Sequence, residues 1–156
     1  MAGYNYGIAR YKHDLKKYPN RIIVGSETFC ADEREFYKMA KENPRIVGDF
    51  VWAGMDYLGE VGVGSWVPKD HCDGIMDGSC GWMTAGSGRV DFIGDETCEA
   101  LYTKVALEKT PIEIGVVPHK YLKMKHSVSS WKMSMALHSW SFEGEEEKTC
   151  RVEVYS

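Results

Sequence analysis

The sequence lacks the long apolar run that a membrane-spanning helix needs. No stretch approaches the ~18–20 apolar residues of such a helix, and no basic region followed by an apolar segment marks a signal peptide at the start. It also lacks a basic excess, because 19 Lys and Arg stand against 23 Asp and Glu, giving a net charge of −4. We therefore expect neither a membrane partner nor a nucleic-acid partner, since binding to phosphates requires a basic face.

Cysteine is scarce and irregularly spaced. The five cysteines are odd in number, and none of their spacings is a common zinc-binding pattern. His71 and Cys72 are adjacent, but one pair is not a metal site, so we predict no metal and no cofactor. Free thiols and the lack of a visible signal favour the cytoplasm, although an N-terminal signal would be missing if the sequence were cut from a longer exported protein.

What the sequence does contain is the pattern of an α/β fold. Its 156 residues, 44% of them apolar, are enough to bury a core. Short apolar segments at 3–6, 21–24 and 46–52 alternate with helical segments at 9–17 and 32–42. This alternation predicts a parallel sheet covered by helices.

The rest of the chain divides into three parts. Residues 53–94 hold most of the sixteen glycines and are too long for an ordinary connection, which indicates a functional loop. A helix is predicted at 95–109. From about residue 110 the pattern changes to that of an all-β module, with strands predicted at 112–117, 131–137 and 151–155.

Side chains at the carboxyl ends of the three predicted parallel strands suggest a sugar site. Tyr6, Glu27 and Trp52 follow or end these strands, where parallel α/β folds gather reactive groups. Aromatic faces stack on sugar rings, and a carboxylate can attack an anomeric carbon. On the residues alone, simpler interpretations stay open: an exposed or helix-terminal charge for Glu27, a core residue for Trp52, and an ordinary strand-end tyrosine for Tyr6.

Three runs of the sequence resemble the β-galactosidases of glycoside hydrolase family two. They are Tyr4-Asn5-Tyr6, the run from Tyr18 to Phe29 around Gly-Ser-Glu-Thr, and the run from Gly48 to Glu60 with Phe-Val-Trp and Met-Asp-Tyr-Leu-Gly-Glu. The similarity continues through 86–94, 112–118, Trp140 and 152–156. The order and separation of the runs make the resemblance specific, which no single short motif would be.

The resemblance implies a fold and three residue roles. Residues 1–109 would be the last three strands of a (β/α)8 TIM barrel, and residues 110–156 a linker and the first strands of an immunoglobulin-like β domain. Glu27 would be the catalytic nucleophile of a retaining mechanism. Tyr6 would hydrogen-bond to that carboxylate, and Trp52 would form a wall of the sugar pocket.

The second carboxyl group of that mechanism has no counterpart in this sequence. The family carries its acid/base Glu in an Asn-Glu pair, whereas the only similar step here is Glu42-Asn43, in reverse order. We therefore expect the sequence to be a fragment whose open sheet edges need the rest of the barrel or a second copy. We also expect the isolated chain not to hydrolyse β-galactosides, because the mechanism needs two carboxyl groups.

Two alternatives stay open. β-Glucuronidases of the same family recognise the sugar carboxylate with an Asn-x-Lys step, which residues 86–95 lack. A different class is a non-catalytic fragment that binds glycans or another protein. Four tryptophans could supply the binding side chains of such a fragment. They could equally be core and interface residues: Trp66, Trp82, Trp131 and Trp140.

Overall fold

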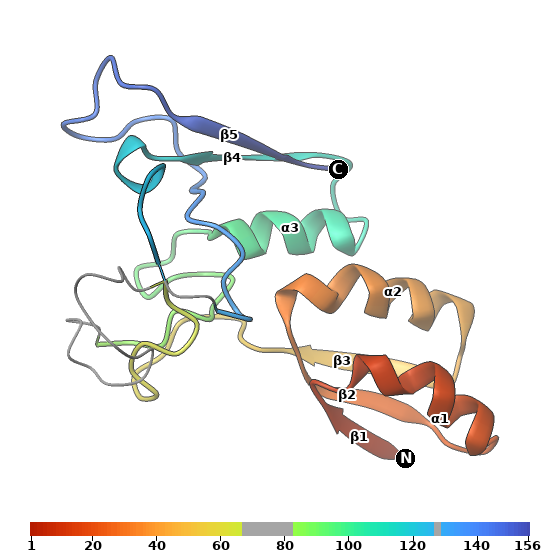
Figure 1. Cartoon of the computed structure of the whole chain (residues 1–156). Coiled ribbons are helices and arrows are strands. Elements are labelled where there is room, and N and C mark those ends of the chain that lie inside the picture. Colours follow the sequence, from red (N-terminus) through yellow and green to blue (C-terminus); the bar gives the residue numbers. More distant parts are fainter. Residues whose placement is uncertain (67–82, 127–128) are drawn as a thin grey trace.

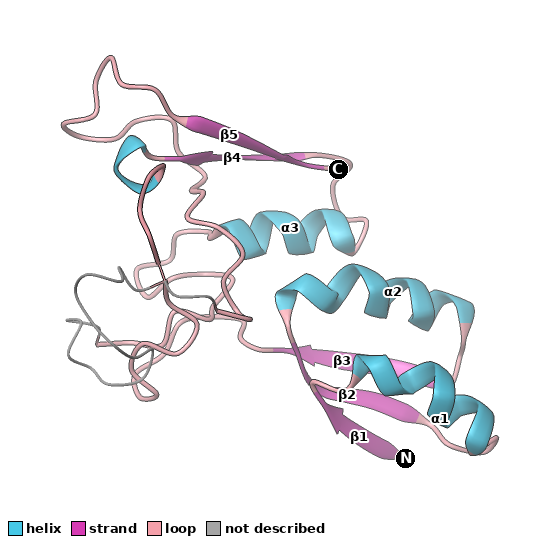
Figure 2. Cartoon of the chain, in the orientation of Figure 1, coloured by secondary structure: helices cyan, strands magenta, loops and turns pink. Residues whose placement is uncertain are grey.

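The computed structural model describes residues 1–66, 83–126 and 129–156. The elements in chain order are β1 (Ala2–Asn5), α1 (Tyr11–Lys17), β2 (Ile23–Thr28), α2 (Glu33–Glu42), β3 (Ile46–Val51), α3 (Cys98–Ala106), β4 (Glu113–Val117) and β5 (Arg151–Tyr155) (Figures 1 and 2). Short 3-10 turns lie at Ile8–Arg10, Cys30–Asp32 and His119–Tyr121. Among the described helices, none has the length and apolar character to cross a membrane.

The first half of the chain forms a parallel sheet with the strand order β1-β2-β3. Helices α1 and α2 make the two crossovers, so the predicted alternation of strands and helices over residues 1–52 is confirmed. The register of both strand pairs shifts near the carboxyl ends, between Tyr4 and Asn5 and between Gly25 and Thr28. These irregular ends carry the side chains that were expected to form a site.

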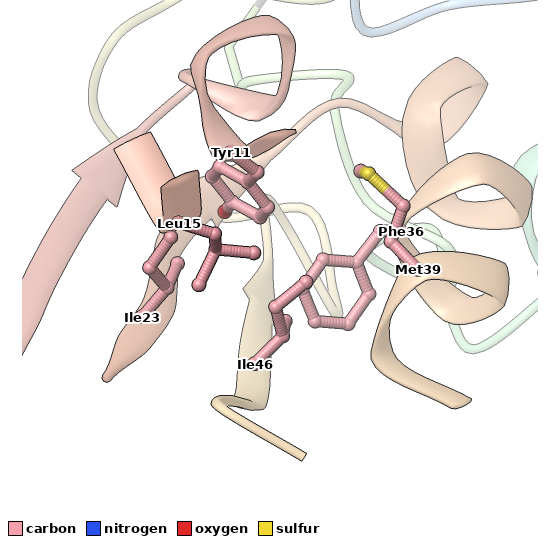
Figure 3. Packing of buried hydrophobic residues seen from close by; sticks show 6 residues of the cluster. All are labelled: Tyr11, Leu15, Ile23, Phe36, Met39 and Ile46. Atoms are coloured by element: carbon pink, nitrogen blue, oxygen red, sulfur yellow. The ribbon is translucent and has the colours of Figure 1, made fainter. Parts of the chain in front are cut away.

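One face of this sheet holds the larger core. Both helices present apolar side chains at helical spacing to the same two strands, and six buried residues pack together: Tyr11, Leu15, Ile23, Phe36, Met39 and Ile46 (Figure 3). Burying side chains of this size stabilises the fold by roughly 2 kcal/mol each. Strand β3 also carries Val47 and Phe50, which these helices leave 57% and 68% exposed.

The second half of the chain adds a helix and a two-stranded antiparallel sheet. Helix α3 lies between α2 and the β4–β5 pair (Figure 1). It begins after Thr97, which has extended backbone, and ends before Glu108, which has a φ of 56°. The helix is therefore shorter than the 95–109 predicted. Its buried Cys98 packs with Val117 and Ala136 in a second, smaller core.

The strand predicted at 131–137 is wrong. All seven residues are described, and they make only isolated bridges, from Leu137 to Thr97 and to Val116. Side chains accept hydrogen bonds from backbone N–H groups that would otherwise pair with a neighbouring strand. The Glu99 carboxylate accepts the amide N–H of Met133, and the Ser134 hydroxyl accepts that of Ala136. The apolar residues Met133 and Met135 pack against the smaller core without forming a strand.

Candidate active site

The structure brings Tyr6, Glu27 and Trp52 to one edge of the parallel sheet. Tyr6 directly follows β1, Glu27 is the penultimate residue of β2, and Trp52 directly follows β3. Backbone hydrogen bonds hold them in register: the Tyr6 amide donates to the Glu27 carbonyl at 2.8 Å, and the Trp52 amide donates to the Thr28 carbonyl at 3.3 Å. All three side chains are half-buried, so they can contact both the protein and a ligand.

The backbone of Tyr6 adopts a conformation that L-residues avoid. Its φ is +50°, in the left-handed region, which costs a bulky residue on the order of 1–3 kcal/mol. The hydrogen bond to the Glu27 carbonyl compensates part of this cost. The turn carries the Tyr6 side chain away from the line of β1 and toward the end of β2.

The Tyr6 side chain lies in a cluster of aromatic rings. It stacks on Phe29 with 4.1 Å between the ring centroids, and its hydroxyl accepts a 2.9 Å hydrogen bond from Trp131 Nε1. The pKa of Tyr6 is raised to about 12, chiefly by burial and also by Glu27, while the hydrogen bond from Trp131 acts in the opposite sense. The phenol therefore stays protonated near neutral pH and can donate to the Glu27 carboxylate.

Gly25 allows close packing two residues before Glu27. A Cβ at this position would lie 2.3 Å from Asp49 Oδ1 and 3.1 Å from the Tyr11 hydroxyl. Thr28 Oγ1 donates to that same Asp49 oxygen at 2.5 Å. Only glycine leaves room for this polar contact beneath the end of β2.

A buried ion pair fixes the backbone of Trp52. Arg89 Nη1 donates to the Trp52 carbonyl at 2.9 Å, and Arg89 Nη2 pairs with the Glu33 carboxylate. The side chains of Arg89 and Glu33 are 7% and 1% exposed. Burial raises the pKa of Glu33, while Arg89 and a hydrogen bond from Thr103 lower it. The pair thus joins α2 and α3 to the residue after β3.

The Trp52 ring faces residues of the glycine-rich loop. It meets Tyr57 edge to face with 5.7 Å between the centroids, and the Tyr57 hydroxyl donates to the Glu60 carboxylate. Asp56 turns into the loop instead, where its carboxylate accepts the Gly88 N–H at 2.7 Å. Asp56 therefore organises the loop, and Trp52 and Tyr57 supply the aromatic surface next to Tyr6.

Trp131 also belongs to this cluster, although the sequence suggested it only as a possible glycan-binding residue or as a core or interface residue. It lies 125 positions from Tyr6 and comes from a segment predicted as a strand of a different domain. Its neighbours hold it in place, because buried Glu99 on α3 pairs with Lys132 Nζ at 3.1 Å and accepts the Met133 amide at 2.6 Å. Burial would lower the pKa of Lys132, but the Glu99 carboxylate raises it above its usual value.

The other tryptophans, and the residues considered for a metal site, do not belong to this aromatic cluster. Trp66 stacks on His126 with 3.5 Å between the ring centroids and donates to the Lys132 carbonyl at 3.2 Å, whereas Trp140 is 66% exposed. Trp82, His71 and Cys72 lie outside the described residues. In the described ranges, no group of three or more His, Cys, Asp or Glu is placed to hold a metal ion.

The structure is similar to a solved protein from Bacteroides cellulosilyticus, with a TM-score of 0.76 and 28% sequence identity over 98% of this chain. The match is to a member of glycosyl hydrolase family 2. A second family 2 member, from Bacteroides cellulosilyticus DSM 14838, shares the fold with a TM-score of 0.63 at 24% identity over 98% of this chain. Neither a family model nor a curated protein matches the sequence.

The first of these structures belongs to the family that the sequence runs resemble, and its description names no substrate. The chain spans about a fifth of the length of the solved structures: 20% of the first and 17% of the second.

Proposed function

We propose that this chain is the part of a retaining β-galactosidase that carries the catalytic nucleophile. The observation that carries the proposal is Glu27 at the carboxyl edge of the parallel sheet, with Tyr6 and Trp52 beside it. The chain is also similar to a glycosyl hydrolase family 2 member over 98% of its length. Residues 1–109 are then the last three strands of a TIM barrel, and residues 110–156 begin the following β domain.

The nucleophile acts in two steps. A Glu27 carboxylate oxygen attacks the anomeric carbon and forms an ester bond to it, while the glycosidic C–O bond breaks and the leaving oxygen takes a proton from the acid/base. A water molecule then hydrolyses the ester with retention of configuration. Tyr6 donates a hydrogen bond to Glu27 and so orients the carboxylate for its attack on the anomeric carbon.

The acid/base and the missing barrel walls belong to a partner segment. The exposed Val47 and Phe50 of β3 and the open edges of β1 and β3 are surfaces that a closed barrel buries. The remainder of the barrel, or a second copy of the chain in its place, would cover them. The isolated chain therefore supplies one of the two carboxyl groups and does not turn over substrate.

The choice of a neutral galactoside over a glucuronide rests on the segment 86–95. It has no Asn-x-Lys step, and its one basic residue, Arg89, is buried in the pair with Glu33. A buried and already paired guanidinium is not available to a sugar carboxylate. Segment 86–95 therefore offers no unpaired cation that would favour glucuronic acid.

The test is an assay of the protein expressed together with the coding sequence that adjoins it in frame. We expect hydrolysis of a chromogenic β-galactoside, loss of that activity in Glu27→Gln, and no loss in Glu35→Gln, which changes an exposed carboxylate on α2. Faster hydrolysis of the β-glucuronide would favour the related activity instead. Full activity in Glu27→Gln would overturn the proposal.

A further inference from the structure

Trp131 makes a polar contact with the candidate catalytic edge from a distant part of the chain. Its indole N–H donates to the Tyr6 hydroxyl at 2.9 Å. Its ring also meets Tyr6 and Phe29 edge to face, with 5.9 and 5.3 Å between centroids. The three rings thus pack against one another, with the Trp131–Tyr6 hydrogen bond between two of them.

This contact restricts the acceptors to which the Tyr6 hydroxyl can donate its hydrogen bond. An indole N–H is only a donor, whereas a phenol can donate one hydrogen bond and accept others. Because Trp131 donates to the phenol oxygen, the Tyr6 proton has to point to a different acceptor. Glu27 is the neighbour of Tyr6 at this strand edge, where its carbonyl accepts the Tyr6 amide at 2.8 Å, and its carboxylate contributes to the raised pKa of Tyr6. Glu27 is therefore the acceptor that we assign to the Tyr6 proton.

One buried residue anchors the two residues that directly follow Trp131. Glu99, which is fully buried on α3, pairs with the Lys132 ammonium group and accepts the amide of Met133. A second indole also restrains the segment, because Trp66 Nε1 donates to the Lys132 carbonyl at 3.2 Å. The indole is therefore presented by an anchored backbone rather than by a free loop.

We propose that Trp131 is a positioning residue, which holds the Tyr6 hydroxyl in place so that its O–H is directed toward the proposed nucleophile Glu27. This inference rests on the proposed role of Glu27 and extends it to a residue outside the parallel sheet. It also gives the segment around Trp131 a function in the catalytic site. The effect requires the N–H group, so an aromatic ring without it cannot replace Trp131.

The first experiment tests the hydrogen bond in the 156-residue chain. The ¹⁵N–¹H spectrum shows the indole N–H groups, and Trp131→Phe identifies the Trp131 resonance by removing it. We expect Tyr6→Phe to move this resonance and to speed its hydrogen exchange. We also expect Glu27→Gln to move it, because the bonds polarise one another. An indole signal that ignores both substitutions would overturn the proposal.

The second experiment tests the consequence in the protein expressed with its adjoining in-frame sequence. We expect Trp131→Phe to lower kcat about fivefold while KM changes little, because losing one neutral hydrogen bond that orients the Tyr6 hydroxyl corresponds to about 1 kcal/mol. Trp140→Phe is the matched control, since it removes an indole that is 66% exposed, and should leave kcat unchanged. An unchanged kcat in Trp131→Phe, or an equal loss in both variants, would overturn the inference.

The two experiments separate this inference from the function on which it rests. If wild-type protein has no glycosidase activity, the proposed function fails and the catalytic role of Trp131 fails with it, whatever the spectrum shows. If activity is present and depends on Glu27 but kcat is unchanged in Trp131→Phe, only the positioning role is wrong.

Discussion

Arg89 donates a 2.9 Å hydrogen bond to the carbonyl of Trp52 while it pairs with Glu33. Because both charged side chains are buried, the pair transmits the position of helix α2 to the residue expected to line the sugar pocket. The same guanidinium belongs to the segment 86–95, so one contact joins a helix, a strand end and the glycine-rich loop.

Removing Arg89 alone should strongly destabilise the fold. Arg89→Met leaves the Glu33 carboxylate buried without its cation, which typically costs about 3–5 kcal/mol. Urea unfolding of the chain measures this loss. The double variant Glu33→Leu/Arg89→Met should recover much of it, because no charge then stays buried. A loss of less than about 1 kcal/mol in the single variant would show that the pair has little structural importance.

The space at Gly25 gives a second prediction. Gly25→Ala places a methyl group within 2.3 Å of Asp49 Oδ1 and so must separate Thr28 from Asp49 or shift the end of β2. We expect a loss of about 1–3 kcal/mol in unfolding free energy. Gly48→Ala is the control on the neighbouring strand, because nothing lies within 4 Å of its added Cβ. Equal stability of both variants would contradict this packing.

The stability of the parallel sheet should fall at acidic pH through Asp14. Hydrogen bonds from Tyr4 and His13 and the charges of Arg10 and Arg21 lower the pKa of Asp14 from 3.8 to about 2. Since the pKa is lowered in the folded state, this contribution is complete above pH 3.8 and is lost as the pH falls toward 2. Asp14→Asn should be less stable at neutral pH and should show a flatter acid limb of unfolding. If the acid limb of Asp14→Asn is the same as that of the wild type, groups other than Asp14 cause the loss of stability in acid.

The isolated 156-residue chain should not hydrolyse β-galactosides. It carries Glu27 but no counterpart of the acid/base Glu, and a retaining glycosidase needs both. A chromogenic galactoside incubated with the purified chain should give no product above the rate of Glu27→Gln. Turnover that Glu27→Gln abolishes would mean that a second carboxyl group of this chain takes the acid/base role.

The sequence was sufficient for features that depend on local pattern. Apolar segments separated by helical ones predicted the parallel sheet that β1, β2 and β3 form. The tendency of reactive groups to lie at the carboxyl ends of parallel strands predicted that Tyr6, Glu27 and Trp52 share one edge. That these residues act in catalysis stays a prediction. The barrel and the boundary near residue 110 are also untested.

Long-range polar contacts were the features that the pattern could not predict. Trp131 reaches Tyr6 across 125 residues, and its segment is irregular because Glu99 and Ser134 take backbone N–H groups from a strand ladder. Likewise, Arg89 in a glycine-rich loop gave no sign of a buried partner on α2. The alternation of apolar residues in a segment does not show which buried carboxylate on another element will contact that segment.

The most direct test of the account is to find the residue that becomes covalently bound to the sugar. The protein, expressed with its adjoining in-frame sequence, is treated with 2,4-dinitrophenyl 2-deoxy-2-fluoro-β-galactoside, whose good leaving group allows the ester to form and whose fluorine slows its hydrolysis. Peptide mass spectrometry should then find one fluorogalactosyl group on Glu27. A label on another carboxylate, or steady turnover of galactosides with Glu27 unlabelled, would contradict the assignment of the nucleophile.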